Sequence, residues 1–270
     1  MNNAISTHAQ RPKFSAMIST PSYQKMINNT LKDPKRAQRF IASITSAVAT
    51  NPALQECDPA TILSGALLGE SLNLSPSPQL GQYYLVPFNN TKKGCKDAQF
   101  QLGYKGYVQL ALRSGYYKHL NVIAVKAGEL VHFDPLTEEV EINITSDELS
   151  RESAETVGYL AMFEYLNGFR KTIYWSREKM EAHALKYSKG YAAKKGYTFW
   201  EKDFDAMAFK TMLRQLISKW GIMSIDLQTA FEADYEVEEN PDYIEAAGEN
   251  EQNEPENLED AAEQVDLNDI

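Results

Sequence analysis

The amino-acid sequence predicts an α+β fold, with N-terminal helices, a central antiparallel sheet and hairpin region, a long C-terminal helix and a disordered acidic tail. Helical patterns stand at both ends of the body with strand patterns between them, and no regular βαβ alternation occurs. The 270 residues are 43% hydrophobic and 24% charged, which is enough to bury a core in one or two domains. A turn dipeptide between two strand patterns, Asn167-Gly168, indicates antiparallel neighbours.

The charges divide the chain into a body and an acidic tail, and residues 1–20 stand apart because they are polar and lack helical periodicity. Of the 37 acidic residues, 14 lie in residues 236–270, which contain no Lys or Arg, so residues 1–235 hold 27 basic and 23 acidic residues. The net charge of −10 therefore belongs to the tail, and the body is slightly basic. We expect a flexible N-terminal arm over 1–20, a core over 21–235 and a disordered acidic tail over 236–270.

Two helices are expected near the start of the core. The range 34–50 has apolar residues at helical spacing and begins with Asp33-Pro34, which suits an N-cap followed by the first helical position. A second helix begins with the same signature at Asp58-Pro59 and runs toward Leu72. The Ser/Pro-rich stretch 75–78 then breaks the helical pattern.

Strand patterns follow these helices. They cover residues 83–88, 98–102, 120–126 and 140–144. The clearest hairpin joins 157–166 to 169–175 through Asn167-Gly168. This dipeptide predicts a type I′ turn, in which both central residues have positive φ.

The last part of the core is expected to be helical again. Ser176 can cap a helix that runs to Tyr187, and a loop rich in Gly, Lys and Tyr follows over 188–200. The final helix covers 203–220, with Gly221 as its stop.

Motifs of nucleotide hydrolysis and metal binding are missing from the sequence. The loop over 190–196 lacks the Lys-Ser/Thr pair of a phosphate-binding loop, which argues against an ATPase. The four histidines and two cysteines show no metal-ligand spacing, and Cys57 and Cys95 do not suggest a disulfide framework. We expect no cofactor, no enzymatic activity and a reducing, cytoplasmic environment.

A group of carboxylates between Glu129 and Glu141 is the feature that suggests a nuclease. These side chains alternate along a predicted strand that faces water, and no lysine stands beside them, so we interpret them as solvated surface. No apolar stretch suits an export signal or a membrane span, so no membrane partner is expected.

The first cationic feature is the stretch 98–115, a strand that enters a short helix through a glycine turn. Lys105, Gln109 and Arg113 share one helix face, and Gly103 and Gly106 would let a phosphate approach the backbone at the helix entrance. An ordinary amphipathic helix with a solvated basic face explains the pattern equally well.

The second cationic feature is the stretch 207–221, which covers most of the final helix and its stop. Its predicted buried stripe consists of Phe209, Met212, Leu213, Leu216, Ile217 and Trp220. Lys210 and Arg214, beside Thr211, fall on another face one turn apart. An anion between two such cations relieves their repulsion, and phosphate is the natural candidate.

The third feature is the density of positive charge over 170–219, with 12 basic and 5 acidic residues. Its candidate DNA contacts are Arg170, Lys171, Lys186, Lys189, Lys194 and Lys195. Interleaved with them are Tyr174, Trp175, Tyr187, Tyr191, Tyr197, Phe199 and Trp200. Charges that follow a backbone, with rings that contact bases, are typical of single-strand binders, although such rings more often belong to a core.

Three stretches, 58–88, 99–115 and 200–221, resemble the RecT family of phage single-strand annealing proteins, and the resemblance covers about 21–234. It implies an ATP-independent recombinase that coats single-stranded DNA, anneals it to a complementary strand and assembles into rings or helical filaments. It also implies that Lys105, Arg113, Lys210 and Arg214 line a groove for the DNA backbone. The expected partners are single-stranded DNA, the annealed duplex, an exonuclease and host single-strand binding protein, with Mg²⁺ only modulating DNA binding.

Two other functions and three roles of the tail stay open at this point. A passive single-strand binding protein would protect DNA without accelerating annealing, and a Mg²⁺-dependent nuclease would cut it. The tail either competes with DNA or recruits a partner through its carboxylates, or it is a solvating appendage.

Overall fold

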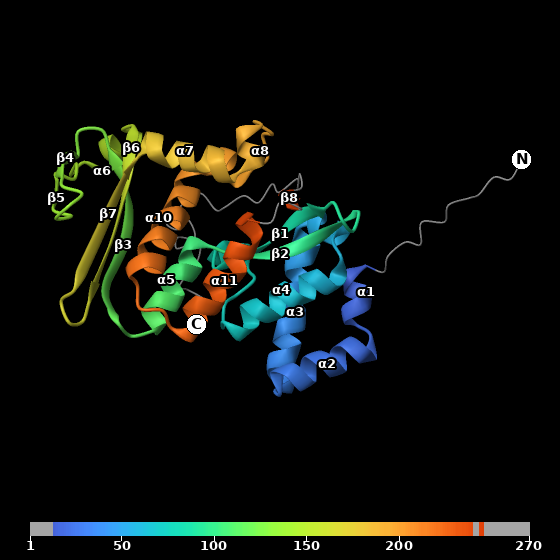
Figure 1. Ribbon diagram of the computed structural model, residues 1–270. Helices are drawn as coiled ribbons and strands as arrows, with labels where there is room; N and C mark the ends of the chain where they lie inside the picture. Colours follow the sequence, from blue (N-terminus) through green and yellow to red (C-terminus); the bar gives the residue numbers. More distant parts are fainter. Residues whose placement is uncertain (1–12, 240–242, 246–270) are drawn as a thin grey trace, which may run out of the picture.

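The computed structural model describes residues 13–239 and 243–245, with side chains described for 13–234 (Figure 1). The α-helices are α1 (Phe14–Ile18), α2 (Pro21–Leu31), α3 (Pro34–Thr50), α4 (Pro59–Ser71), α5 (Tyr104–Arg113), α6 (Glu148–Ser153), α7 (Arg177–Tyr187), α8 (Lys189–Ala192), α9 (Phe199–Lys202), α10 (Phe204–Trp220) and α11 (Ile225–Glu239). The strands are β1 (Tyr83–Asn90), β2 (Cys95–Leu102), β3 (Tyr117–Lys126), β4 (Leu130–Phe133), β5 (Val140–Ile142), β6 (Thr156–Tyr165), β7 (Arg170–Ser176) and β8 (Tyr243–Glu245). The short 3₁₀ segments are η1 (Pro52–Glu56) and η2 (Pro78–Leu80). The α+β class predicted from the sequence is confirmed.

The N-terminal helices begin where capping chemistry predicts. The Asp33 carboxylate accepts from the Lys35 N–H at 2.9 Å, and that of Asp58 accepts from Ala60 at 3.0 Å, so α3 and α4 start at the prolines that follow. The structure corrects the expected arm, because α1 buries Phe14, Met17 and Ile18 at helical spacing within it. The rest of the arm, residues 1–12, lies outside the described residues.

The strands form two three-stranded sheets and one hairpin, all antiparallel. Their orders are β2-β1-β8, β3-β6-β7 and β4-β5. Strand β8 and the last turn of α11 both lie in the segment predicted as disordered tail, so the folded part extends further than composition indicates. Three residues are too few to show a strand pattern in a charge-rich sequence. The other residues of the predicted tail, 240–242 and 246–270, lie outside the described residues.

The predicted β6–β7 hairpin is present, but its turn differs from the prediction. Gly168 has φ of 86°, whereas Asn167 is not among the described residues with positive φ, which excludes a type I′ turn. The Gly168 N–H donates to the Tyr165 carbonyl at 3.0 Å and the Tyr165 N–H to the Phe169 carbonyl at 2.8 Å. The single left-handed residue is therefore the bulge glycine of a longer loop.

The C-terminal helices also differ in part from the prediction. Helix α7 starts at the Ser176 cap as predicted, but the expected loop over 188–200 contains α8 and the start of α9. Gly221 follows α10 with φ of −76°, so it is not a left-handed stop; a Cβ there would lie 2.6 Å from the Ile217 carbonyl oxygen. Helix α11 was not predicted.

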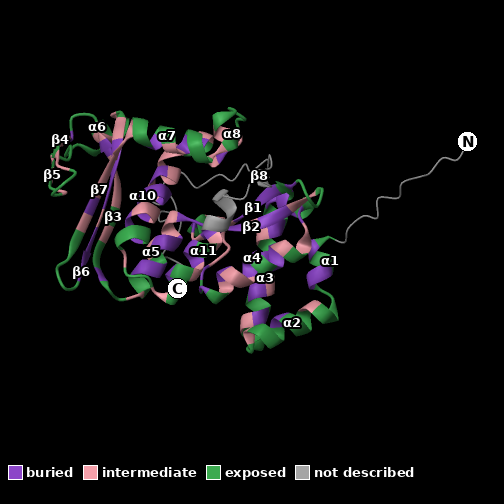
Figure 2. Ribbon diagram, in the orientation of Figure 1, coloured by how far each residue is buried: buried purple, intermediate pink, exposed green. Residues whose placement is uncertain are grey.

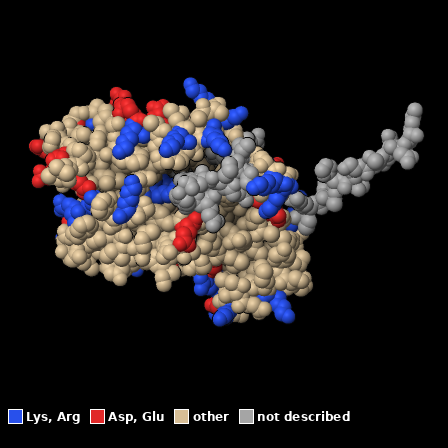
Figure 3. Space-filling view, viewed as in Figure 1, with Lys and Arg blue, Asp and Glu red and all other residues tan. Residues whose placement is uncertain are grey.

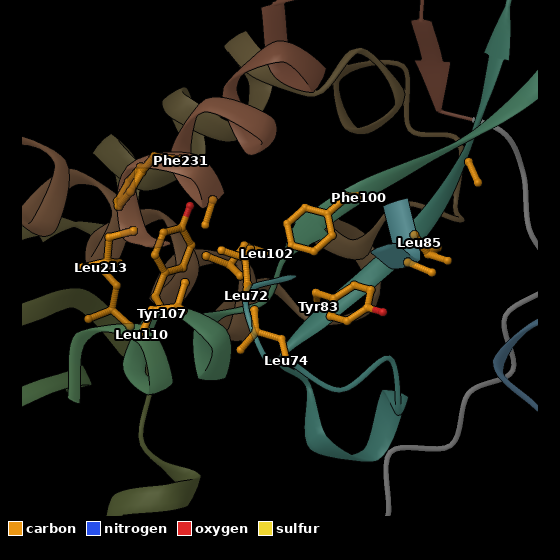
Figure 4. Close-up of a cluster of buried hydrophobic side chains, with 14 of the residues drawn as sticks. Leu72, Leu74, Tyr83, Leu85, Phe100, Leu102, Tyr107, Leu110, Leu213 and Phe231 are labelled. Atoms are coloured by element: carbon orange, nitrogen blue, oxygen red, sulfur yellow. The ribbon is translucent and has the colours of Figure 1, made fainter. Parts of the chain in front are cut away.

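The core joins α5, α10 and α11 to the β2-β1-β8 sheet. Tyr107 and Leu110 of α5 lie beside Leu213 of α10 and Phe231 of α11 (Figure 4), and the rings of Tyr107 and Phe231 are 5.0 Å apart. Buried positions concentrate on these facing surfaces, while the outer surface of α7 and α8 is mainly exposed (Figure 2). Within the described ranges, no helix is both long and apolar enough to cross a bilayer.

Candidate nucleic-acid interface

The two cations predicted on α10 lie against a buried aspartate of α11, with Lys210 buried and Arg214 half-buried. Lys210 Nζ lies 3.0 Å from Asp234 Oδ1, and Arg214 Nη1 lies 3.8 Å from Oδ2. The Tyr107 hydroxyl donates to the same carboxylate at 2.8 Å and the Leu102 N–H at 3.2 Å. The anion predicted between Lys210 and Arg214 is thus a carboxylate of the same chain. The sequence analysis missed it because α11 was not predicted.

Other parts of the α10 prediction also need correction. Met212, Leu213, Leu216 and Ile217 are buried, but Phe209 is only half-buried and Trp220 is 49% exposed. The ammonium group of Lys171 stands 3.5 Å from the centre of the Trp220 ring, a cation–π contact at the surface. Thr211 is buried, which leaves it without access to a bound strand in this conformation.

The glycines at the start of α5 admit a neighbouring chain segment in the place where a phosphate was predicted. A Cβ on Gly103 would lie 2.1 Å from the Gly81 carbonyl oxygen, and one on Gly106 would lie 2.1 Å from that of Gln82. The Gly103 N–H donates to the Gln82 carbonyl at 2.9 Å. Backbone packing therefore requires both glycines.

The polar face of α5 is only partly available. Gln109 and Arg113 are exposed and Lys105 is half-buried. Arg113 Nη1 donates to the Asn73 carbonyl at 3.3 Å, which ties the end of α5 to the loop after α4. The helix itself starts at Tyr104.

The two cations predicted on β7 are paired with carboxylates. Arg170 Nη2 lies 3.0 Å from Glu164, which also accepts from Lys118 at 2.7 Å. Hydrogen bonds from Lys118 and then Arg170 lower the pKa of Glu164 to about 2. Lys171 forms an ion pair with Glu138, so neither β7 cation is a bare charge.

The remaining predicted lysines lie together at the surface of α7, α8 and the loop before α9. Lys186, Lys189, Lys194 and Lys195 are all exposed. In the part of the chain that the structure describes, no ion pair joins these four to a carboxylate. Figure 3 shows Lys and Arg side chains in a row over α7 and α8. We call the four residues the lysine row.

A ladder of rings runs beside the lysine row. The rings of Trp175 and His183 are 5.5 Å apart and those of His183 and Tyr187 are 4.5 Å apart. Lys179 Nζ stands 4.5 Å from the Trp175 ring centre, and Lys186 Nζ 5.0 Å from that of Tyr187. Cations and flat rings thus alternate along one surface, an arrangement that suits a nucleic-acid strand.

His183 and Lys179 were not among the predicted site residues. Their signal was helix spacing, since Lys179, His183, Lys186 and Tyr187 follow i, i+4, i+7 and i+8 along α7. Burial, reinforced by the charges of Arg214 and Lys186, lowers the pKa of His183 to about 4. The imidazole is therefore neutral at pH 7 and contributes a ring to the ladder, not a charge.

Not every predicted ring is available to a base. Trp200 is buried, and the centre of its ring lies 5.0 Å from that of Phe204. The Tyr191 ring packs against both, so Trp200 is a core residue. The loop that carries Lys194 and Lys195 is anchored by Glu201, which accepts from the Gly196 N–H at 2.8 Å and the Thr198 hydroxyl at 2.8 Å.

Of the carboxylates around β4 and β5, Glu139 and Glu141 are exposed as predicted, Asp134 and Glu138 are half-buried, and Glu129 is completely buried. The expectation that no lysine stands beside them is wrong, because Lys171 of β7 pairs with Glu138. Burial alone would raise the pKa of Glu129, but hydrogen bonds from Arg151 at 2.7 Å and from two backbone N–H groups lower it. Across the described residues, no three His, Cys, Asp or Glu side chains are grouped so that they could hold a metal ion.

The chain is similar to known proteins over most of its length. The model of the RecT family matches residues 38–256. The uncharacterized protein YqaK of Bacillus subtilis is 41% identical over 238 residues, which is 88% of this chain and 78% of YqaK. Protein RecT of Escherichia coli is 29% identical over 221 residues, 81% of this chain and 79% of that protein.

Proposed function

Because the chain belongs to the RecT family of single-strand annealing proteins, we propose that it anneals complementary DNA strands without ATP, on an oligomer of its own subunits. Family membership supports a role in DNA recombination through single-strand annealing, and proteins of this family are annealing proteins rather than catalytic enzymes. The further proposal is that the lysine row and the ring ladder of α7 hold the strand. The partner exonuclease, host single-strand binding protein and bacterial cytoplasm expected from the resemblance remain part of this proposal.

The observation that carries the proposal is the contrast in partners among the basic residues. Lys210, Arg214, Arg170 and Lys171 each have a carboxylate of the same chain beside them, whereas the lysine row has none among the described residues. A phosphate backbone that enters the row releases its counterions without displacing a protein carboxylate.

Annealing follows from contacts of this kind. Lysines that hold the backbone leave the base edges free, so the incoming strand and not the protein reads the sequence. Neutralising one strand lowers its repulsion toward the second, and base pairing supplies the free energy of the step. No nucleotide hydrolysis is needed, and weak contacts repeated along many subunits give avidity.

The test mixes labelled complementary oligonucleotides with the protein in excess EDTA without nucleotide, and scores duplex formation and strand integrity. We expect accelerated pairing of intact strands. Protection of the strands without acceleration would identify a passive single-strand binder, and activity restored only by ATP would refute the proposal. A partial stimulation by Mg²⁺ is compatible with it, because divalent ions also screen strand repulsion.

The site is tested with a matched pair of variants. Replacing all four lysines of the row by Gln removes the charges, and replacing them by Arg keeps them at the same positions. We expect the Gln variant to lose annealing and the Arg variant to retain it. Equal activity in the two variants would place the DNA elsewhere.

A further inference from the structure

The lobe formed by residues 127–155 is little covered by the rest of the chain. Strands β4 and β5 pair only with each other, α6 buries none of its residues, and Glu129 is the single buried residue of the lobe. A two-stranded hairpin is marginally stable alone in water. Apolar side chains are nevertheless exposed on it: Val131, Leu136, Ile144 and Leu149, of which Leu136 is 90% and Leu149 78% exposed.

The exposed apolar side chains of this lobe stand among carboxylates. Residues 127–155 include nine acidic residues and one basic residue, Arg151, whose charge is matched by the buried Glu129. Figure 3 shows acidic side chains over β4 and β5. A partner for this surface must therefore bring both apolar contact and positive charge.

The same chain carries a surface of that kind at its other end. Helix α2 buries only Ile27 of its 11 residues and leaves Met26 exposed, with Tyr23 and Leu31 half-buried. Residues 13–55 hold six basic residues and one acidic residue: Lys13, Lys25, Lys32, Lys35, Arg36 and Arg39 against Asp33. Of the six, Arg36 is matched by Glu70.

The two surfaces cannot meet within one molecule. In Figure 1 the lobe with β4, β5 and α6 stands at one end of the molecule and α2 and α3 at the other, with α7 and α8 between them. We propose that the acidic lobe of one copy docks on the α2–α3 surface of the next copy, an inference that rests on the oligomeric form of the proposed function. The occupant is a second copy because this chain itself supplies the complementary charge and apolar area.

This geometry has two consequences for the assembly. The two contacting surfaces differ, so the contact is head-to-tail and each added copy leaves one surface of each kind free, which produces a ring or a helical filament. The lysine row lies between the two ends and stays uncovered for DNA. The attraction involves exposed charges, so added salt will weaken the assembly.

Charge reversal of the two surfaces tests the proposal. The lobe variant replaces Glu139, Glu141, Glu148, Glu152 and Glu155 by Lys, which changes the net charge of residues 127–155 from −8 to +2. The helix variant replaces Lys25, Lys35 and Arg39 by Glu, which changes that of residues 13–55 from +5 to −1. All eight side chains are exposed, and among the described residues none takes part in an ion pair. Sedimentation velocity with complementary oligonucleotides measures assembly, and circular dichroism with thermal melting confirms that each variant is folded.

Each variant alone should lose assembly, because its two surfaces then carry the same sign. An equimolar mixture should regain it with one copy of each variant per repeat, because the reversed lobe now fits the reversed helices and the two unchanged surfaces still match. Assembly of either variant at the wild-type level, or a mixture that fails to recover, overturns the proposal. The proposal is also overturned if the lobe variant loses assembly while the helix variant assembles fully, because the lobe would then dock elsewhere.

Failure of the docking proposal can be distinguished from failure of the proposed function. Binding of an oligonucleotide short enough for one subunit measures the lysine row, and both variants should bind it as the wild type does. A wild-type protein that assembles through these surfaces but does not accelerate pairing would refute the annealing proposal and leave the interface standing.

Discussion

The lysine row of α7 to α9 and the Lys210–Arg214 pair of α10 are built from the same residue types but have different surroundings. The row is exposed and lacks carboxylate partners among the described residues, whereas the buried Lys210 and the half-buried Arg214 stand around Asp234, itself 1% exposed. A cation whose charge is already matched inside the protein stabilises the fold, and binding a phosphate would require Asp234 to leave. In this protein the presence of an internal anion, more than the density of basic residues, separates the cations that are paired within the chain from those that we propose to bind DNA.

The largest effect is expected from Asp234→Ala. The substitution removes the carboxylate that pairs with the buried Lys210 ammonium group and accepts from the Tyr107 hydroxyl, so the free energy of unfolding should fall by about 3–5 kcal/mol. Urea unfolding followed by circular dichroism measures this. A change below about 1 kcal/mol would mean that the cluster is not structural, and the contrast with the lysine row would disappear.

Lys210→Ala tests the same contrast between paired and exposed cations by removing the cation in place of the carboxylate. Helix spacing alone predicts that this variant keeps its fold and binds one phosphate fewer, which lowers the slope of log affinity against log salt by roughly 0.7. The structure predicts the reverse, a destabilised protein whose remaining folded fraction binds DNA with an unchanged slope. A stable variant with the lower slope would show that Asp234 yields its place to DNA.

The next effect in size concerns the four lysines of the row. Their joint replacement by Gln should lower single-strand affinity about a hundredfold at moderate salt, for every base sequence alike. The salt slope should fall by roughly 0.7 for each phosphate that the row no longer neutralises. A titration at several salt concentrations gives both quantities. Equally weak binding by the matched Arg variant would indicate damage to the loop and not removal of charge.

A smaller effect is expected at the end of the ring ladder. Tyr187 is 43% exposed, and Tyr187→Ala should weaken single-strand binding by about 1 kcal/mol with no change in salt slope, because the variant cannot stack on a base but keeps every charge. Tyr187→Phe keeps the ring and serves as the control in the same titration. Normal binding by the Ala variant would show that bases do not reach this ring.

The last expected effect, confined to acidic pH, is a pH dependence of stability from His183. Its pKa is lowered from 6.5 to about 4 by burial and by Arg214 and Lys186, so the unfolded chain binds the extra proton first. The contribution of the neutral His183 imidazole to the free energy of unfolding is fully present above pH 6.5 and is lost as the pH falls from 6.5 toward 4. Thermal melts of the wild type and His183→Gln across this window should converge at low pH; parallel curves would contradict the assignment.

Glu164 affects the free energy of unfolding at lower pH than His183 does, so the contributions of the two groups can be told apart. Its pKa is lowered from 4.5 to about 2, so its contribution is present above 4.5 and is lost as the pH falls toward 2. Between pH 6.5 and 4.5 the decrease in stability therefore reports mainly His183.

Local chemistry made much of the fold predictable. Asp33-Pro34, Asp58-Pro59 and Ser176 mark helix starts that the structure confirms, because a cap acts on backbone groups two or three residues away. The turn at Asn167-Gly168 was placed correctly but given the wrong type, since one positive φ suffices for a bulged loop.

The site was predictable only where it faces solvent. The lysine row follows from composition, but the burial of Lys210 depends on Asp234, 24 residues further along the chain, in a helix whose apolar pattern is weak. Such long-range pairing leaves no local signature. The same holds for Gly103 and Gly106, whose small size is explained by a segment that precedes them by more than 20 residues in the chain.

Strand β8 covers the outer edge of β1 by pairing Phe88, Asn89 and Asn90 with residues 243–245. A chain that ended at residue 235, where charge composition alone would cut it, would lack this strand and leave the backbone N–H and C=O groups of that edge open. Open edges pair readily with strands of other molecules, so the shortened protein should aggregate during concentration even if its core is intact. Charge composition is thus an unsafe guide to where this chain can be shortened.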